Sequence, residues 1–179
     1  GDLMSLNRVE GNERVRPTQR VVLNDIIQST CHSLQPLALQ AGVKFEFESP
    51  ELPVEIYGDS DQLTQVFTNI IGNALKYGAS GGRITLRMTT IAREAALRAP
   101  GVRLQVIDYG AGIDPVHLPR LTERFYRVDG HRSRELGGTG LGLAIVKHII
   151  NRHRGKLNIK SALGEGTTVT VMLPTEPLS

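Results

Sequence analysis

The stretch DQLTQVFTNIIGNALKY, residues Asp61–Tyr77, carries the strongest structural signal in the chain. Its apolar residues recur at i, i+3, i+4 and i+7, which is the spacing of one face of an α-helix. The residues that share this spacing are Leu63, Val66, Phe67, Ile70, Ile71, Ala74 and Leu75. Asp59 has the side chain of a helix N-cap. We therefore predict an amphipathic helix that begins near Ser60 and packs on the core.

A polar stripe runs along the same segment, formed by Gln62, Gln65, Asn69, Asn73 and Lys76. Asn69 and Asn73 are i, i+4 neighbours and share one face. Amide oxygens suit Mg²⁺, which also keeps water and nucleotide phosphates as ligands, while Lys76 can meet phosphate charge and Tyr77 offers a ring near a base. The alternative is a solvated face, but such a face is normally rich in Glu, Lys and Arg, and asparagine is a poor mid-helix residue. The stripe favours a magnesium–nucleotide site.

Two glycine-rich segments follow, and the first is VIDYGAGI, Val106–Ile113. Asp108 ends an apolar run that is typical of a strand, and Gly110 and Gly112 let the backbone turn sharply and approach a ligand. A buried carboxylate at this point can accept a hydrogen bond from an adenine amino group. Because Asp followed by Gly-x-Gly also forms ordinary turns, this segment alone is a weak signal.

The second segment, GGTGLG at Gly137–Gly142, leads directly into a predicted helix over Leu141–His153. Backbone N–H groups at a helix N-terminus form an anion site, so phosphates are expected here. The segment is neither a P-loop nor a dinucleotide-binding loop, because Leu143 stands where the first needs lysine and the second needs glycine.

The remaining elements define the fold class. We predict a further helix over Leu23–Ala41. Strands are predicted over Val43–Glu48, Arg83–Thr89, Val102–Asp108, Leu157–Ser161 and Thr167–Leu173. A variable excursion, Ile91–Pro100, is expected between the strands Arg83–Thr89 and Val102–Asp108. Strands interleaved with helices indicate an α+β protein built as a two-layer α/β sandwich, with one sheet and its helices on one face.

Composition restricts the class of protein further. The chain has 179 residues, a net charge of +3 and one cysteine, Cys31, so it suits one domain with no internal disulfide, in a reducing, cytosolic compartment. No apolar run approaches the roughly 20 residues of a membrane span. Arginines gather over Arg120–Arg134, but the chain has no tryptophan and only 4% aromatic residues. We therefore expect that segment to face phosphate or a partner protein, and no nucleic acid to bind.

Together these segments resemble the GHKL ATPase superfamily, and within it the catalytic and ATP-binding domain of bacterial sensor histidine kinases. DQLTQVFTNIIGNALKYG is similar to the family's N box, DYGAGI to its G1 box, ERFYR to its F box, GGTGLGLAIVKHII to its G2 box and GEGT to its G3 box. The sequence from RFYRVDG onward is most similar to the phosphate-regulon type of sensor kinase. The resemblance implies the Bergerat fold, with a mixed, mostly antiparallel sheet.

The resemblance also implies roles for individual residues. Asn73 would coordinate Mg²⁺, with Asn69 supporting the metal, and Lys76 would contact phosphate. Tyr77 would pack on adenine, and Asp108 would bind the adenine amino group. The other expected ATP-binding residues are Gly110, Gly112, Ile113, Phe125, Arg127, Gly138, Thr139, Gly140, Leu141, Gly142 and Thr167. Among these, Phe125 would anchor a lid, Arg127 would act with Asn69 and Lys76 in catalysis, and Thr167 would close the far wall of the adenine pocket.

One departure within the superfamily shapes the expected chemistry. Hydrolytic members carry a glutamate at the position of Asn69, and an amide cannot take a proton from water. Gly72, just before Asn73, supplies no base either. We therefore expect transfer of the γ-phosphoryl group of ATP to a histidine on another domain. The alternatives are a nucleotide-binding pseudokinase that signals by docking, and an ATP-driven clamp, which Asn69 disfavours.

The expected organisation is that of one part of a kinase. Residues 1–13 would end a dimerisation and histidine-phosphotransfer helix, 14–22 a linker, 23–174 the ATP-binding domain with a lid over 115–137, and 175–179 a tail. His32 lacks the sequence context of a phosphoacceptor, so the acceptor would lie upstream. The implied partners are a homodimerising acceptor domain and a response regulator. The chain alone is expected to be monomeric, and to be the cytoplasmic domain of an inner-membrane sensor.

Overall fold

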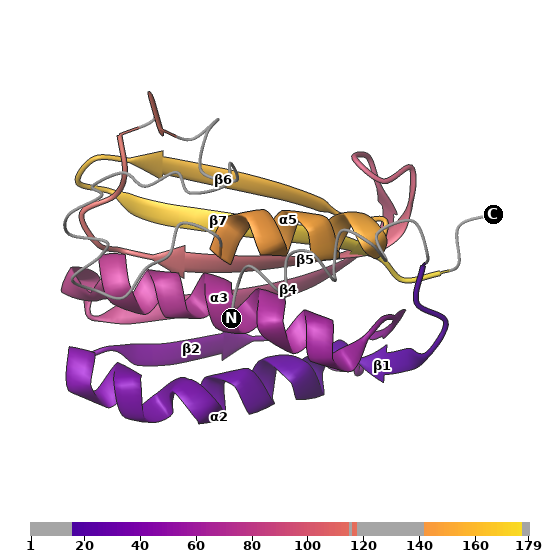
Figure 1. Ribbon diagram of the computed structural model, residues 1–179, viewed down its shortest axis with the longest axis horizontal. Helices are drawn as coiled ribbons and strands as arrows, with labels where there is room; N and C mark the ends of the chain where they lie inside the picture. Colours follow the sequence, from indigo (N-terminus) through magenta and orange to yellow (C-terminus); the bar gives the residue numbers. More distant parts are fainter. Residues whose placement is uncertain (1–15, 115, 118–141, 177–179) are drawn as a thin grey trace.

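The computed structural model of the chain describes residues 16–114, 116–117 and 142–176 (Figure 1). The elements in chain order are β1 (Arg20–Val22), α2 (Leu23–Ala41), β2 (Lys44–Glu48), β3 (Glu55–Tyr57), α3 (Ser60–Tyr77), a 3₁₀ turn η1 (Ala79–Gly81), β4 (Arg83–Glu94), β5 (Ala99–Asp108), α5 (Gly142–Arg152), β6 (Lys156–Ala162) and β7 (Gly166–Pro174).

Five strands form one layer in the order β2-β4-β5-β7-β6. β2 runs parallel to β4, and the other neighbouring strands pair antiparallel. Helices α2, α3 and α5 lie together on one face of this sheet (Figure 1). The predicted class, a two-layer α/β sandwich with a mixed and mostly antiparallel sheet, is therefore confirmed.

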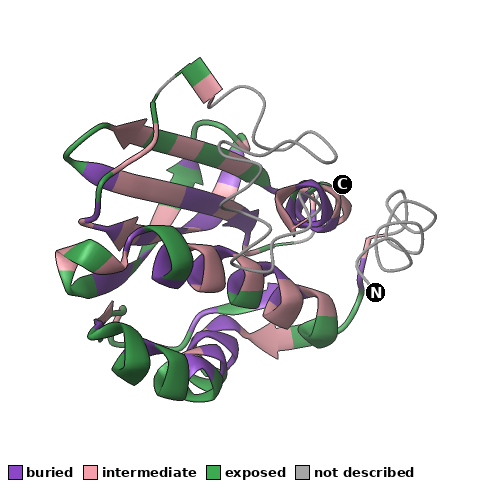
Figure 2. Cartoon of the chain, turned by 60° about the vertical axis from the view of Figure 1, so that its left-hand side comes forward, coloured by how far each residue is buried: buried purple, intermediate pink, exposed green. Residues whose placement is uncertain are grey.

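The core lies between the two layers, and α3 is central to it because it packs against both α2 and α5. Every residue of the apolar stripe predicted on this helix is buried. Alternate residues of β4 and β5, such as Leu86 and Leu104, are buried opposite them, as the period of a strand requires. Figure 2 shows the buried residues on the facing surfaces of helices and sheet.

The helix ends agree with the local sequence signals. The N–H of Gln62 donates to Asp59 Oδ1 at 3.1 Å, so Asp59 caps α3 as predicted. Gly42 ends α2 in the left-handed conformation, with φ of 70°. No helix in the described ranges is long and apolar enough to cross a membrane.

Two sequence-based expectations were wrong. The excursion over Ile91–Pro100 is instead a continuation of the β4–β5 hairpin, interrupted by an irregularity in register. The charged residues of this stretch do not show the apolar pattern of a strand, because the buried position of Glu94 is filled by a carboxylate. That carboxylate accepts a 2.8 Å hydrogen bond from Arg103 Nη2. The prediction of a single sheet was also incomplete, because β1 pairs antiparallel with β3 in a second, two-stranded sheet. Strands of three residues are too short to show a period.

Candidate functional site

The polar stripe of α3 meets the beginning of α5. Asn69 Nδ2 donates to the carbonyl oxygen of Gly142 at 3.3 Å, joining residues 73 positions apart in the sequence. This contact uses the donor side of the Asn69 amide, so the oxygen is left as an acceptor. Asn73, one turn further along, is half-buried on the same face. The structure thus brings Asn69 to the last residue of the second glycine segment, with Asn73 on the same face of α3.

Asp108 lies at the carboxyl end of β5 and is only 7% exposed. The N–H of Gly110 donates to its Oδ1 at 3.1 Å, and the backbone of Thr167 provides a second hydrogen bond. Burial raises the pKa of Asp108, and the two backbone hydrogen bonds oppose this rise. Asp108 and Thr167 are direct partners across the β5–β7 pair, so two predicted adenine-binding residues lie side by side.

Close backbone contact brings the end of α3 to the end of β5. A Cβ added at Gly110 would lie 2.6 Å from Gly78 Cα, and one added at Gly78 would lie 2.5 Å from Asp108 Oδ1. Neither position has room for a side chain. Gly78 was not among the predicted site residues, although it directly follows the Asp61–Tyr77 stretch. The close contact of Gly78 is with Asp108, which is distant in the sequence, so no local pattern indicates it.

Ser161 is a second site residue that no sequence pattern indicates. Its Oγ donates to the Gly166 carbonyl oxygen at 2.9 Å and accepts from the Ile113 N–H at 2.7 Å. A hydroxyl has only one proton, so the 2.7 Å contact with Thr167 Oγ1 must be donated by Thr167. Ser161 therefore fixes both Ile113 and Thr167, and leaves the Thr167 oxygen as an acceptor.

The first glycine segment reaches Ser161 through a turn that requires glycine. Gly112 has a φ of 77°, and a Cβ there would overlap the carbonyl oxygen of Ala162. The turn therefore holds the segment after Asp108 against the β6–β7 hairpin.

The remaining predicted residues are divided by their place in the chain. Lys76 and Tyr77 are exposed at the last turn of α3, with Tyr77 at 40%. The residues that lie outside the described ranges are Phe125, Arg127, Gly138, Thr139, Gly140 and Leu141, together with most of the expected lid.

The chemistry of the donor set indicates how a cation would be held. Across the described residues there is no group of three His, Cys, Asp or Glu side chains that could hold a metal. The amide oxygens of Asn69 and Asn73 are hard ligands and are only two in number. A cation bound by them would therefore be a hard ion that takes its other ligands from phosphate and water. The residues present therefore fit Mg²⁺ bound together with a nucleotide, and do not fit a metal cage made of protein side chains.

Residues 58–177 match the family model described as histidine kinase-, DNA gyrase B-, and HSP90-like ATPase. The chain belongs to this family, whose ATPase character agrees with the assembled site. Membership implies that the chain binds ATP.

Individual relatives narrow the class. The phosphate regulon sensor protein PhoR of Pseudomonas aeruginosa is 40% identical over 170 residues, which cover 94% of this chain and 36% of that protein. The sensor histidine kinase RppB of Synechocystis is 36% identical over 173 residues, covering 97% of this chain and 37% of that protein. The chain thus spans little more than a third of these curated relatives. The resemblance to sensor histidine kinases, including the phosphate-regulon type, is confirmed.

Solved structures agree with this assignment. The mycobacterial sensor histidine kinase MprB superposes with a TM-score of 0.73 at 28% identity, covering 90% of this chain and 99% of that one. Full-length ShkA, solved in complex with AMPPNP, gives a TM-score of 0.80 at 23% identity and covers 99% of this chain and 35% of that one, and it supports the fold alone.

Proposed function

We propose that this chain is the ATP–Mg²⁺-binding part of a sensor histidine kinase and presents the γ-phosphoryl group of ATP to a histidine of another domain. One observation carries the proposal. Asn69 of α3 contacts the first residue of α5, and the buried Asp108 packs against Gly78 at the end of the same α3, in a chain of the histidine kinase-like ATPase family.

Each end of the nucleotide has its own candidate residues. Asp108 would accept from the adenine amino group, and Thr167 beside it would offer a second acceptor. At the phosphate end, Asn73 would provide an oxygen ligand to Mg²⁺, Asn69 would support it, and Lys76 would pair with phosphate charge. Bound Mg²⁺ would supply neutralisation of the phosphate oxygens. The lid over residues 115–137, with Phe125 and Arg127, and the loop residues from Gly138 to Leu141 would complete the site.

The side chains favour transfer of phosphate over its hydrolysis. In the transfer, a nitrogen of the acceptor imidazole forms a bond to the γ-phosphorus while the bond from that phosphorus to the bridging oxygen breaks, and ADP leaves. Asn69 cannot take a proton from an attacking water, and Gly72 carries no side chain that could act in its place. The contribution of this chain is therefore positioning and charge neutralisation.

The proposed partners follow from this division of work. The acceptor histidine would belong to a dimerisation domain, which makes the whole kinase a homodimer, and a response regulator would receive the phosphoryl group. In such a protein the chain would be the cytoplasmic domain of an inner-membrane sensor.

Affinity for Mg-ATP provides the first test. Replacing Asn73 with alanine should weaken binding at least tenfold, a loss of about 1.4 kcal/mol. Asn151→Ala serves as the control, because Asn151 is an exposed amide on α5, away from the stripe. Equal affinity of the Asn73→Ala variant and the unmodified chain would show that the metal role of Asn73 is wrong.

A reconstitution experiment separates the kinase from the alternatives. The chain is incubated with labelled ATP and a separate dimerisation domain that carries its acceptor histidine, taken from a sensor of the phosphate-regulon type. Label on the added domain supports the kinase. Nucleotide binding without transfer supports a docking pseudokinase, and rapid release of free phosphate supports an ATP-driven clamp.

A further inference from the structure

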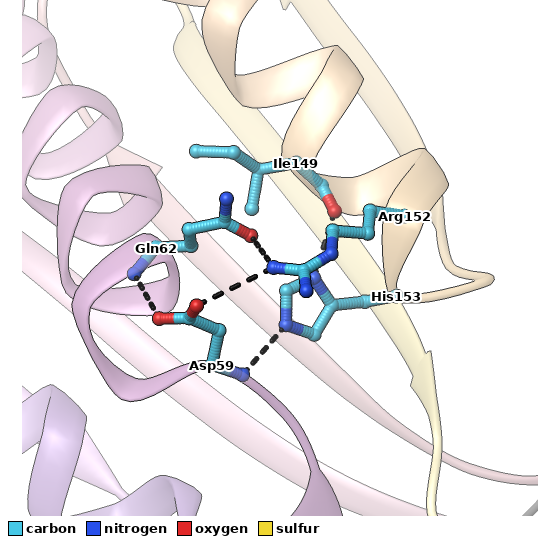
Figure 3. Close-up of polar contacts among 5 residues, drawn as sticks. All are labelled: Asp59, Gln62, Ile149, Arg152 and His153. Atoms are coloured by element: carbon cyan, nitrogen blue, oxygen red, sulfur yellow. Dashed lines mark hydrogen bonds and ion pairs between the residues drawn. The ribbon is translucent and has the colours of Figure 1, made fainter. Parts of the chain in front are cut away.

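A compact polar cluster joins α3 to α5 away from the Asn69–Gly142 contact (Figure 3). Arg152 Nη1 donates to Gln62 Oε1 at 2.8 Å and to Asp59 Oδ2 at 3.3 Å. The backbone N–H of Asp59 donates to His153 Nε2 at 3.0 Å. The cluster therefore connects the N-cap and first turn of α3 to the end of α5. Gln62 belongs to the polar stripe predicted to face the nucleotide, but in the structure its side-chain oxygen accepts from Arg152.

The hydrogen bonds of His153 determine its protonation state. Because Nε2 accepts from the Asp59 N–H, it carries no proton, so Nδ1 carries the proton and donates to the Ile149 carbonyl oxygen at 2.8 Å. The imidazole is therefore neutral, and it is only 1% exposed. A protonated ring would place an N–H against the Asp59 N–H, so the contact between the helices would be lost.

The two connections between the helices lie at different levels. Near one end of α5, Gly142 accepts from Asn69, and at its other end Arg152 and His153 hold Asp59 and Gln62. Between Ser60 and Asn73 the helix α3 extends roughly 20 Å. A tilt of about 5° at its first turn would displace Asn73 by roughly 2 Å, using the rise of an α-helix. A misplacement of about 1 Å is enough to cost a reaction roughly 100-fold.

We propose that Asp59, Gln62, Arg152 and His153 form an interhelical clamp that positions Asn69 and Asn73 against the beginning of α5. The side chains of Gln62, Arg152 and His153 and the cap of Asp59 hydrogen-bond to one another and are not among the residues proposed to bind nucleotide or metal, so we assign them a positioning role. Their effect on nucleotide binding rests on the proposed function, whereas their effect on the Asn69–Gly142 contact does not.

Two variants of one residue test the clamp. In His153→Gln the side-chain oxygen can stand where Nε2 stands and accept from the Asp59 N–H. In His153→Asn the shorter amide reaches only the place of Nδ1, so it keeps the Ile149 bond and leaves the Asp59 N–H unpaired. Both variants replace the ring by an amide of similar polarity, so a difference between them reports the interhelical bond.

The first readout is the side-chain amide resonance of Asn69, which needs no nucleotide. We expect it to move to a solvent-like position in His153→Asn and to stay near its original position in His153→Gln. The second is affinity for Mg-ATP at pH 8, expected to fall at least tenfold in the first variant and less than threefold in the second. Identical behaviour of the two variants in the Asn69 resonance would overturn the clamp. Absence of Mg-ATP binding by the unmodified chain would instead overturn the proposed function and leave the first readout decisive for the clamp.

A third variant covers the case in which His153→Asn does not fold. Gln62→Met removes the acceptor of the 2.8 Å bond from Arg152 while keeping the length of the side chain. It should shift the Asn69 resonance in the same direction, whereas Gln28→Met, an exposed position on α2, should not. An unchanged resonance in Gln62→Met would also contradict the proposal.

The clamp also predicts how the stability of the chain depends on pH. Burial lowers the pKa of His153, and the charges of Arg152 and Arg16 lower it further, while the Ile149 bond and Asp59 oppose them. The unfolded chain therefore takes up a proton first, so stability is complete above the ordinary value of 6.5 and declines as the pH falls below it. The thermal midpoint should fall less steeply below pH 6.5 in His153→Gln than in the unmodified chain, and equal slopes would refute the assigned role of His153.

Discussion

Replacing Gly78 with alanine would place a methyl group against the carboxylate of Asp108. The φ of Gly78 is −114°, which any residue can adopt. The cost of the change is therefore one of space and not of backbone strain. The added Cβ would lie 2.5 Å from Asp108 Oδ1 and 2.6 Å from Asp108 Cβ. Since ordinary contacts begin near 3.4 Å, the carboxylate or the end of α3 must move by roughly 1 Å.

Two effects determine the size of the loss. Overpacking a filled site costs about 1–3 kcal/mol, and moving Asp108 weakens a hydrogen bond from Gly110 to a charged acceptor, worth about 1.5–3 kcal/mol when intact. Alanine recovers about 0.4–1 kcal/mol by restricting the unfolded chain. We therefore expect a net loss of about 2–3 kcal/mol, which lowers the thermal midpoint by roughly 4–12 °C.

Gly72→Ala is the matched control. Gly72 lies inside α3, and a Cβ there would meet nothing within 4 Å, so helix propensity should stabilise the chain by about 1 kcal/mol. Urea unfolding measures both variants, and calorimetry measures their affinity for ATP. If Gly78→Ala is as stable as Gly72→Ala and binds ATP equally well, the close contact between Gly78 and Asp108 does not constrain the site.

Burial raises the pKa of Cys31 to about 11 from 9.0, so its thiolate fraction falls about 100-fold; its alkylation at pH 8 should be slower than that of free cysteine by a similar factor, and should accelerate in urea. Burial raises the pKa of Asp108 above 3.8 in the chain without nucleotide. The unmodified chain should bind ATP more tightly than Asp108→Asn, and this advantage should begin to shrink at a pH above 3.8 as the solution is acidified. A constant advantage down to pH 4 would contradict the role of the carboxylate. Arg103→Ala should cost about 1–2 kcal/mol in urea unfolding, because it leaves the buried Glu94 carboxylate without its cationic partner, and the partial exposure of Arg103 moderates the loss. Arg87→Ala breaks an exposed pair with Glu48 and should produce no measurable loss, and equal costs of the two arginine variants would refute the distinction.

Local sequence determined the elements whose signal repeats along the chain. The two stripes of α3, its cap at Asp59 and the end of α2 at Gly42 all depend on residues within a few positions of one another. Each was predictable because a helix places i and i+4 on one face, whatever the rest of the fold does. The order of the glycine segments and the N box was specific enough to indicate the family and the identity of the candidate site residues.

Tertiary structure alone decided the partners of residues that are far apart in the sequence. Gln62 reads as one more amide of the ligand stripe, yet it binds Arg152 on another helix. Ser161 shows no pattern in its strand, yet its hydroxyl orients Thr167 and holds Ile113. Gly78 marks only the end of a helix until Asp108 is packed against it. A periodic pattern specifies which face of an element is polar or apolar, but the atom that meets that face is chosen only when the chain closes on itself.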